Sequence, residues 1–300
     1  MEVQQTLAGF ANIFASYRSE FGWEPSPGSL AAEATRREAE VAGAWSDEPV
    51  ADLLALVSLQ MTSAAEHLEG VARVLEDEPM VFVPASVARG VVEAAGRSWW
   101  LLDPNLTLDQ RVHRALTERL YGIWENSKYP ERVRGREVWE RKMARILGEA
   151  ARREVPFATG TDRRAPYVGA ERRPPSTRLT QELFGSKEIG TLVYRHLSAI
   201  AHATTSLAQG VDPDLEEHEL APAAAHLVVN ADSVILLGLG ASWAFSSAFN
   251  RLIVFYGWDA TSWLSWRQFR LSKLWRMLEA VPRTERRIPD QDEFAPPGTE

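Results

Sequence analysis

The chain has 300 residues, no cysteine and a formal net charge of −8 at pH 7. Because cysteine is absent, disulfides, thiolate nucleophiles, iron–sulfur clusters and cysteine zinc sites are excluded, and any chemistry must use oxygen and nitrogen side chains. The acidic balance argues against a general nucleic-acid binder, which usually needs a basic surface. The hydrophobic content of 45% is enough for a substantial core.

Helical periodicity dominates the sequence, and no series of short alternating strands stands out. We therefore predict an all-α fold, a helical bundle of about eight or nine helices. The N-terminal segment has no basic region ahead of an apolar one, so it indicates an amphipathic helix and a cytoplasmic protein. The expected helices cover residues 3–21, 29–44, 50–76, 85–102, 108–127, 131–153, 187–209, 220–256 and 260–280.

Local signals support several of these helices. Thr107 followed by Gln110 is typical of a capping box, and Ser46 before Pro49 is a plausible helix start. Residues 233–250 carry no charge and approach the length of a membrane span, but serines, glycines and Asn250 favour a buried bundle helix. No membrane partner is expected.

The helical pattern fails at residues 154–178, where prolines alternate with arginines. A loop of this length is either a solvated linker, the favoured alternative, or a lid over a site. The apolar helix that follows needs partners from the first half of the chain. We therefore expect one helical domain over residues 1–280, interrupted by this loop. Residues 281–300 have too few apolar side chains to fold and are expected to be a disordered tail.

The most informative pattern lies in residues 187–209, where Tyr194, Ser198 and His202 recur every four residues in an apolar helical run. This spacing stacks the three side chains on one helix face. Burying such groups without partners costs about 1–3 kcal/mol each. They are therefore expected to bind one another or polar groups on a neighbouring helix.

A second polar stripe, formed by Arg89, Glu93 and Arg97, shows the same four-residue spacing. It is either a solvated face with exposed ion pairs or part of the bundle interior, where Glu93 lies between two guanidinium groups. His67 falls near the apolar face of its own helix and either joins this site or is a hydrogen-bonded histidine at a packing edge. We predict one interior polar site, and its candidate residues are Arg89, Glu93, Arg97, Tyr194, Ser198 and His202, with His67 as a further candidate.

Familiar catalytic motifs are absent. A ferritin-like di-iron site needs glutamate three residues before histidine, and none of the six histidines has one. The zinc motif HExxH and the phosphate-binding motif GxxxxGK[ST] are also missing. No metal and no cofactor are therefore expected.

The segments RGVVEAAGRSWWLLDP, QRVHRAL with its paired arginines, and YRHLSAIAH resemble a family of uncharacterised helical proteins common in actinobacteria. The resemblance covers roughly residues 50–210. The Arg195 and His202 pair also resembles the motif of HEPN domains, helical bundles that often act as metal-independent ribonucleases. That resemblance implies that His202 is a general base for the ribose 2′-hydroxyl, that Arg195 stabilises the phosphorane charge, and that two copies form a homodimer.

Three functions therefore stay open. The first is a binding or structural module whose polar network specifies the core, and it is the favoured one. The second is a HEPN-like ribonuclease, with His202 and Arg195 as its catalytic residues and RNA as its substrate. The third is an enzyme acting on a small organic molecule, with His202 and Glu93 facing a closed pocket.

Overall fold

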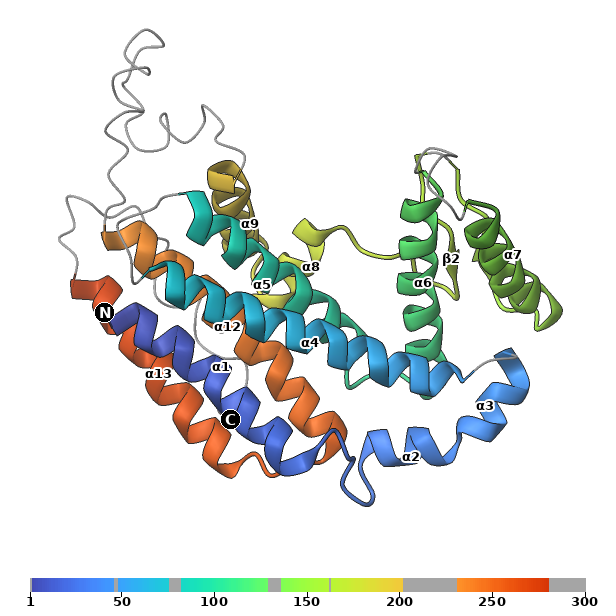
Figure 1. Ribbon diagram of the computed structural model, residues 1–300, viewed down its shortest axis with the longest axis horizontal. Helices are drawn as coiled ribbons and strands as arrows, with labels where there is room; N and C mark the ends of the chain where they lie inside the picture. The colour runs from blue at the N-terminus through green and yellow to red at the C-terminus, as the bar shows by residue number, and fades with distance from the viewer. Residues whose placement is uncertain are drawn as a thin grey trace, which may run out of the picture.

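The computed structural model describes residues 2–45, 48–75, 82–128, 136–161, 163–201 and 231–280. Within these ranges the chain forms eleven helices and one short hairpin, which confirms the predicted all-α class (Figure 1). The elements are α1 (Glu2–Phe21), α2 (Leu30–Arg36), α3 (Glu38–Trp45), α4 (Pro49–Val74), α5 (Phe82–Leu101), α6 (Leu108–Ser127), α7 (Arg136–Arg152), β1 (Phe157–Ala158), β2 (Tyr167–Val168), α8 (Ser176–Leu183), α9 (Lys187–Ala201), α12 (Ala231–Tyr256) and α13 (Thr261–Ala280).

Most helix positions agree with the prediction, with two corrections. The helix α8 (Ser176–Leu183) was not predicted, and it begins inside the segment expected to be a loop. The single helix expected at 29–44 is two helices, because α2 ends at Arg36 and the Arg37 N–H bonds back to carbonyls of α2 before α3 begins. Residues 202–230 and the tail at 281–300 lie outside the described residues, so the expectations for them stay predictions.

The helix starts show how local signals operate. The capping box at Thr107 and Gln110 is confirmed, since each side chain bonds the backbone of the other residue. Ser46 lies outside the described residues, and α4 begins at Pro49. Its N-terminal amides are instead bound by the Glu38 carboxylate of α3, which accepts from Val50 at 3.3 Å and from Ala51 at 2.9 Å. A carboxylate is favourable there because it meets the positive end of the helix dipole.

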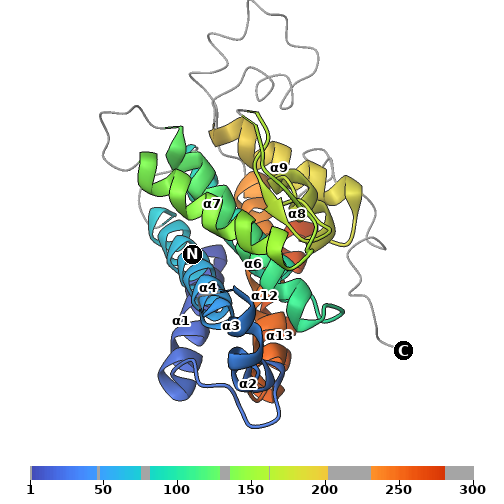
Figure 2. The same cartoon turned by 90° about the vertical axis from the view of Figure 1, so that its right-hand side faces the viewer.

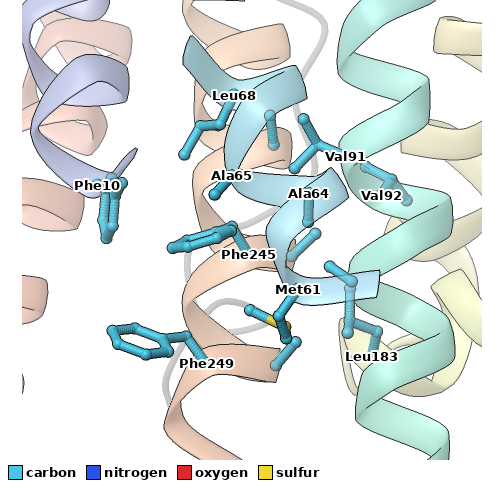
Figure 3. Close-up of a cluster of buried hydrophobic side chains, with 14 of the residues drawn as sticks. Phe10, Met61, Ala64, Ala65, Leu68, Val91, Val92, Leu183, Phe245 and Phe249 are labelled. Carbon is cyan, nitrogen blue, oxygen red and sulfur yellow. The ribbon is translucent and has the colours of Figure 1, made fainter. Parts of the chain in front are cut away.

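The main core lies between α1, α4, α5, α12 and α13 (Figure 3). Phe245 and Phe249 of α12 have no exposed surface and pack edge-on against Phe10 and Phe14 of α1. Each buried aromatic side chain of this size contributes roughly 1.5–3 kcal/mol. The uncharged segment 233–250 is thus part of the buried helix that its serines and glycines predicted. None of the described helices is long and apolar enough to cross a membrane.

A second, smaller core lies between α3, α6, α7 and the hairpin. In Figure 1, β2 lies between α6 and α7, and in Figure 2 α7 lies in front of the bundle. Thr117 of α6 holds the hairpin, because its hydroxyl donates to the Val168 carbonyl at 3.0 Å and accepts from the Val168 N–H at 3.1 Å. Val168 is buried in this second core. The expectation of a solvated linker at 154–178 is therefore wrong for this hairpin.

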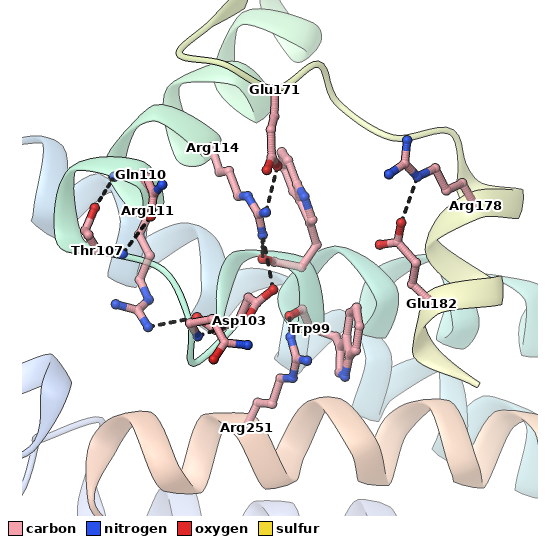
Figure 4. A network of polar contacts seen from close by, with 12 residues as sticks. Trp99, Asp103, Thr107, Gln110, Arg111, Arg114, Glu171, Arg178, Glu182 and Arg251 are labelled. Carbon is pink, nitrogen blue, oxygen red and sulfur yellow. Dashed lines mark hydrogen bonds and ion pairs between the residues drawn. The ribbon is translucent and has the colours of Figure 1, made fainter. Parts of the chain in front are cut away.

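Three arginines bind the C-terminal end of α5 (Figure 4). Arg251 of α12 donates to the Trp99 carbonyl at 2.7 Å, and Arg114 of α6 donates to the Trp100 carbonyl at 2.6 Å. Arg111, one turn before Arg114, donates to the carbonyl of Asp103 at 2.8 Å. The last carbonyls of a helix have no partner within the helix and carry partial negative charge, so buried guanidinium groups stabilise them.

Two arginines of this junction are almost fully buried, and the junction joins the two cores. Arg111 is only 4% exposed to solvent and Arg114 only 9%. Arg251 lies 3.5 Å from the Trp99 ring centroid, and burial lowers its pKa to about 10. Arg114 also binds Glu171 at 2.6 Å, which ties the segment after the hairpin to the same place (Figure 4).

We expect Arg114→Met to lower the free energy of unfolding by about 2–4 kcal/mol, because it leaves the Trp100 carbonyl and Glu171 without their buried partner. Urea unfolding followed by circular dichroism measures this change. Arg36→Met is the control, because Arg36 is paired with Glu33 on the exposed surface of α2, and it is expected to leave the midpoint nearly unchanged. Equal effects of the two substitutions would show that the junction is not stabilising.

Candidate functional site

The structure brings together three of the predicted site residues, Arg89, Glu93 and Tyr194. Arg89 Nε donates to Glu93 Oε1 at 3.0 Å, and Arg89 Nη2 donates to the Tyr194 hydroxyl at 3.1 Å. The same hydroxyl donates to Glu93 Oε1 at 3.1 Å. Each group is therefore bound to the other two, and the guanidinium also lies 5.4 Å from the centroid of the tyrosine ring. We call these three residues the closed triad.

The local sequence explains why α9 comes close enough to form the triad. Gly190, in the first turn of α9, lies against the backbone of α8, where a Cβ atom would stand 2.7 Å from the Gln181 nitrogen. Only glycine permits this approach. Ile189 and Leu197 on the inner face of α9 are buried in the main core. Tyr194 is then carried to the face of α5 that bears Arg89 and Glu93.

The closed triad is half-buried rather than interior, which differs from the predicted placement. The Arg89 side chain is 26% exposed to solvent and the Glu93 side chain 24%. Burial acts to lower the pKa of Arg89, but the hydrogen bond and the charge of Glu93 outweigh it and raise that pKa. Such a partly exposed ion pair contributes a few tenths of a kcal/mol, and each hydrogen bond about 1 kcal/mol.

Arg97, the third residue of the α5 stripe, lies apart from the closed triad. It makes no hydrogen bond or ion pair with any other described residue, and its Nε is buried without a partner. Its charge acts on Tyr121 of α6. Burial raises the pKa of that phenol, the charge of Arg173 opposes the rise, Glu125 adds to it by its charge and a hydrogen bond, and the charge of Arg97 has the smallest effect, which opposes it. The stripe is therefore divided between α9 and α6.

The remaining candidates have separate positions. Ser198 is half-buried and makes no hydrogen bond to another described residue, while Arg195 is exposed on α9. His67 shares a hydrogen bond of 2.7 Å between its Nδ1 and the Ser63 carbonyl, and its ring packs against Gly90. It is thus a histidine at a helix packing edge, one of the two alternatives. His202 lies outside the described residues, so its role stays a prediction.

Sequence reasoning missed a buried ion pair beside Arg97. Arg173, in the segment between β2 and α8, donates from Nε to Glu118 of α6 at 2.8 Å, and the two side chains are only 9% and 6% exposed. The Arg173 guanidinium lies 3.8 Å from the Tyr121 ring centroid, and its Nη2 is buried without a partner. The arginine-rich composition of residues 154–178 was the only sign in the sequence that this segment forms ion pairs. No sequence spacing predicts that Arg173 pairs with Glu118.

The groups at these positions are hydrogen-bonding and charged side chains. Among the residues that the structure describes, no cluster of three or more histidines, aspartates and glutamates could hold a metal ion. The closed triad presents a carboxylate already engaged by a guanidinium and a phenol. Arg97 and Arg173, in contrast, present donors that are not engaged.

No family model, curated protein or solved structure matches this chain. The resemblances to the actinobacterial helical family and to HEPN domains therefore stay expectations from the sequence. Geometry and electrostatics are the support for a function.

We expect the protein to lose stability as the pH falls below about 6.5, the ordinary histidine value. Burial lowers the pKa of His196 on α9 and of His113 on α6, the latter opposed by Asp109. The folded state therefore resists protonation of both rings, so their contribution to stability is fully present above the unfolded pKa and is lost as the pH falls through the lowered folded pKa. Urea midpoints between about pH 8 and pH 5.5 measure the effect, above the range in which ordinary carboxylates titrate.

The double variant His113→Gln, His196→Gln is expected to flatten this pH dependence, whatever its stability at pH 8. If the double variant keeps the full slope of the wild type, the buried histidines are not its source.

Proposed function

We propose that the chain is a helical binding module without catalytic activity, in which the closed triad fixes α9 on α5 and Arg97 is kept for a ligand. The observation that carries this proposal is the division of the α5 stripe. Arg89 and Glu93 are engaged with Tyr194, whereas Arg97 has no partner among the described residues. A purely architectural network would be expected to satisfy all of its members, since a buried donor such as Arg97 Nε is costly without an acceptor.

The state of Glu93 supports binding over general-base catalysis. Both the Arg89 guanidinium and the Tyr194 hydroxyl donate to its Oε1. This carboxylate oxygen is therefore already engaged by two donors from within the closed triad. Glu93 is therefore suited to hold Tyr194 and Arg89 in place.

Two single substitutions on α5 separate the roles of the stripe. We expect Arg89→Met to lower the free energy of unfolding by about 1–2 kcal/mol, because Glu93 and Tyr194 lose a shared partner. Arg97→Met is expected to leave stability unchanged or to raise it by up to about 1 kcal/mol, because it removes a charge without a partner. Both variants exchange an arginine for methionine on the same helix, so helix propensity and net charge are matched. Equal destabilisation by the two would favour a purely structural stripe.

The closed triad can be tested by a double-mutant cycle of Glu93→Gln and Tyr194→Phe. We expect the two substitutions to be non-additive, with a coupling energy on the order of 0.5–1.5 kcal/mol, since both remove the same hydrogen bond. Urea unfolding measures each corner of the cycle. Simple additivity would show that the tyrosine and the carboxylate do not interact in solution.

The ribonuclease alternative is tested on the same purified protein, incubated with single-stranded RNA in the presence of a metal chelator. We expect no cleavage above the buffer rate. Cleavage that is lost in both Arg195→Ala and His202→Ala would overturn the binding-module proposal and establish the alternative.

A further inference from the structure

We propose that the surface formed by α6, the β1–β2 hairpin and the segment after the hairpin binds single-stranded nucleic acid. This inference goes beyond the proposed function, because it rests on a different set of side chains from Arg97. Three aromatic rings and three exposed arginines make up this surface, which we call the basic–aromatic surface: Tyr121, Trp124, Tyr167, Arg163, Arg164 and Arg172.

The first support is the uneven distribution of charge along the chain. Residues 136–178 run from the start of α7 into α8 and contain eleven arginines and lysines but only six aspartates and glutamates, a net charge of +5 in a chain that carries −8 overall. Exposed charges more than about 8 Å apart are largely screened at physiological salt. A polyanion at this surface therefore responds to the local cations, and the acidic overall balance does not exclude it.

The second support is the state of the arginines on this surface. Arg163 and Arg164 at the hairpin tip and Arg172 beyond β2 are exposed, and none of them forms an ion pair with another residue that the structure describes. The tip is held by two backbone hydrogen bonds, from Thr161 N–H to the Arg164 carbonyl at 2.7 Å and from Arg164 N–H to the Thr161 carbonyl at 3.2 Å. Guanidinium groups placed in this way are suited to phosphate, because their planar donors match two of its oxygens.

The third support is that three aromatic rings of this surface lie outside both cores. Tyr121, Trp124 and Tyr167 are half-buried, and none of them belongs to either hydrophobic core. They lie among cations instead: Lys128 Nζ is 3.1 Å from the Trp124 ring centroid, and the Arg172 guanidinium carbon is 5.3 Å from that of Tyr167. Nucleobases stack on exposed aromatic rings while neighbouring cations contact the phosphates.

Direct contacts bring the rings and the arginines together. The rings of Tyr121 and Trp124 are 5.8 Å apart between centroids on α6. Trp124 Nε1 donates to the Thr161 carbonyl at 3.0 Å, so the indole lies against the hairpin tip. The consecutive residues Arg172 and Arg173 contact the rings of Tyr167 and Tyr121. A surface fixed in this way loses less conformational entropy when it binds a ligand.

The aromatic rings favour a single strand over the other polyanions that the arginines would attract. An acidic peptide would pair with the guanidinium groups but would leave the rings without a stacking partner. A duplex keeps its bases stacked on one another and presents mainly phosphates. A single strand offers both phosphates and free base faces.

The experiment measures fluorescence anisotropy of labelled single strands of about twelve nucleotides, oligouridine RNA and oligothymidine DNA, titrated with the full chain. We expect a dissociation constant on the order of 10 μM at physiological salt, weakening as salt is added. The double variant Arg163→Gln, Arg164→Gln is expected to weaken binding by about tenfold. It is also expected to lower the slope of log affinity against log salt by roughly 1.4, since each phosphate contact of a single strand contributes about 0.7.

Trp124→Leu tests stacking separately from charge. It is expected to weaken binding by about tenfold and to leave the salt slope unchanged, because it removes a ring but no charge. Tyr167→Leu is a second ring variant with the same expectation. The matched control for charge is the double variant Arg73→Gln, Arg276→Gln, which removes two exposed arginines from α4 and α13 and is expected to leave the affinity nearly unchanged. Thermal unfolding shows that each variant is folded.

The two probes distinguish RNA from DNA, and a preference for either one supports the inference. Dissociation constants weaker than about 1 mM for both probes overturn it. Equal weakening by the control pair overturns it too, because binding would then follow net charge alone. If polyglutamate competes as well as the oligonucleotides and neither ring variant changes the affinity, the surface binds an acidic protein and the nucleic-acid inference is wrong.

Discussion

The structure depends on how the C-terminal end of α5 is satisfied. Its last carbonyls need donors, and the guanidinium groups of Arg114 on α6 and Arg251 on α12 supply them at 2.6 and 2.7 Å, while Arg111 binds the carbonyl of Asp103 just beyond the helix end. Because α12 belongs to the main core and α6 to the smaller one, this polar junction links two separate sets of apolar contacts. Burying three arginines is costly, and burial lowers the pKa of Arg251 to about 10. The cost is offset because the alternative is a buried helix end without partners.

Because α5 is held in place at this junction, the position of its polar stripe is also fixed. The apolar face of α5 packs in the main core, with Val91 and Ala95 fully buried. Arg89 and Glu93 then bind Tyr194 of α9, and the charge of Arg97 acts on Tyr121 of α6. The residues of this four-residue repeat therefore interact with two different helices, α9 and α6. The repeat looks uniform in the sequence. In the structure, however, Arg89 and Glu93 are bound to Tyr194, whereas Arg97 has no partner among the described residues.

The predictable parts of the structure were those set by short-range rules. The capping box at Thr107, the ion pair between Arg89 and Glu93, and the buried helix over 233–250 follow from spacings of three or four residues and from apolar content. Tyr194 was placed on the right helix face, but its approach to α5 depends on Gly190, whose role is visible only once α8 is present. The pairing of Glu118 with Arg173 and of Thr117 with Val168 joins positions more than fifty residues apart. No periodicity encodes such contacts, and the prolines of 154–178 conceal them by suggesting a loop without a partner.

The contrast between Arg114 and Arg97 gives the last step of the argument. Arg114 is only 9% exposed and Arg97 is partly buried, and the two lie on neighbouring helices, α6 and α5. Arg114 binds a carbonyl and a carboxylate, so its burial is accounted for within the fold. Arg97 binds neither within the described residues, and methionine or leucine at that position would pack without the cost of desolvating a charge. Binding sites are where stability is commonly given up for function, so the missing partner of Arg97 supports our proposal that this residue is kept for a ligand.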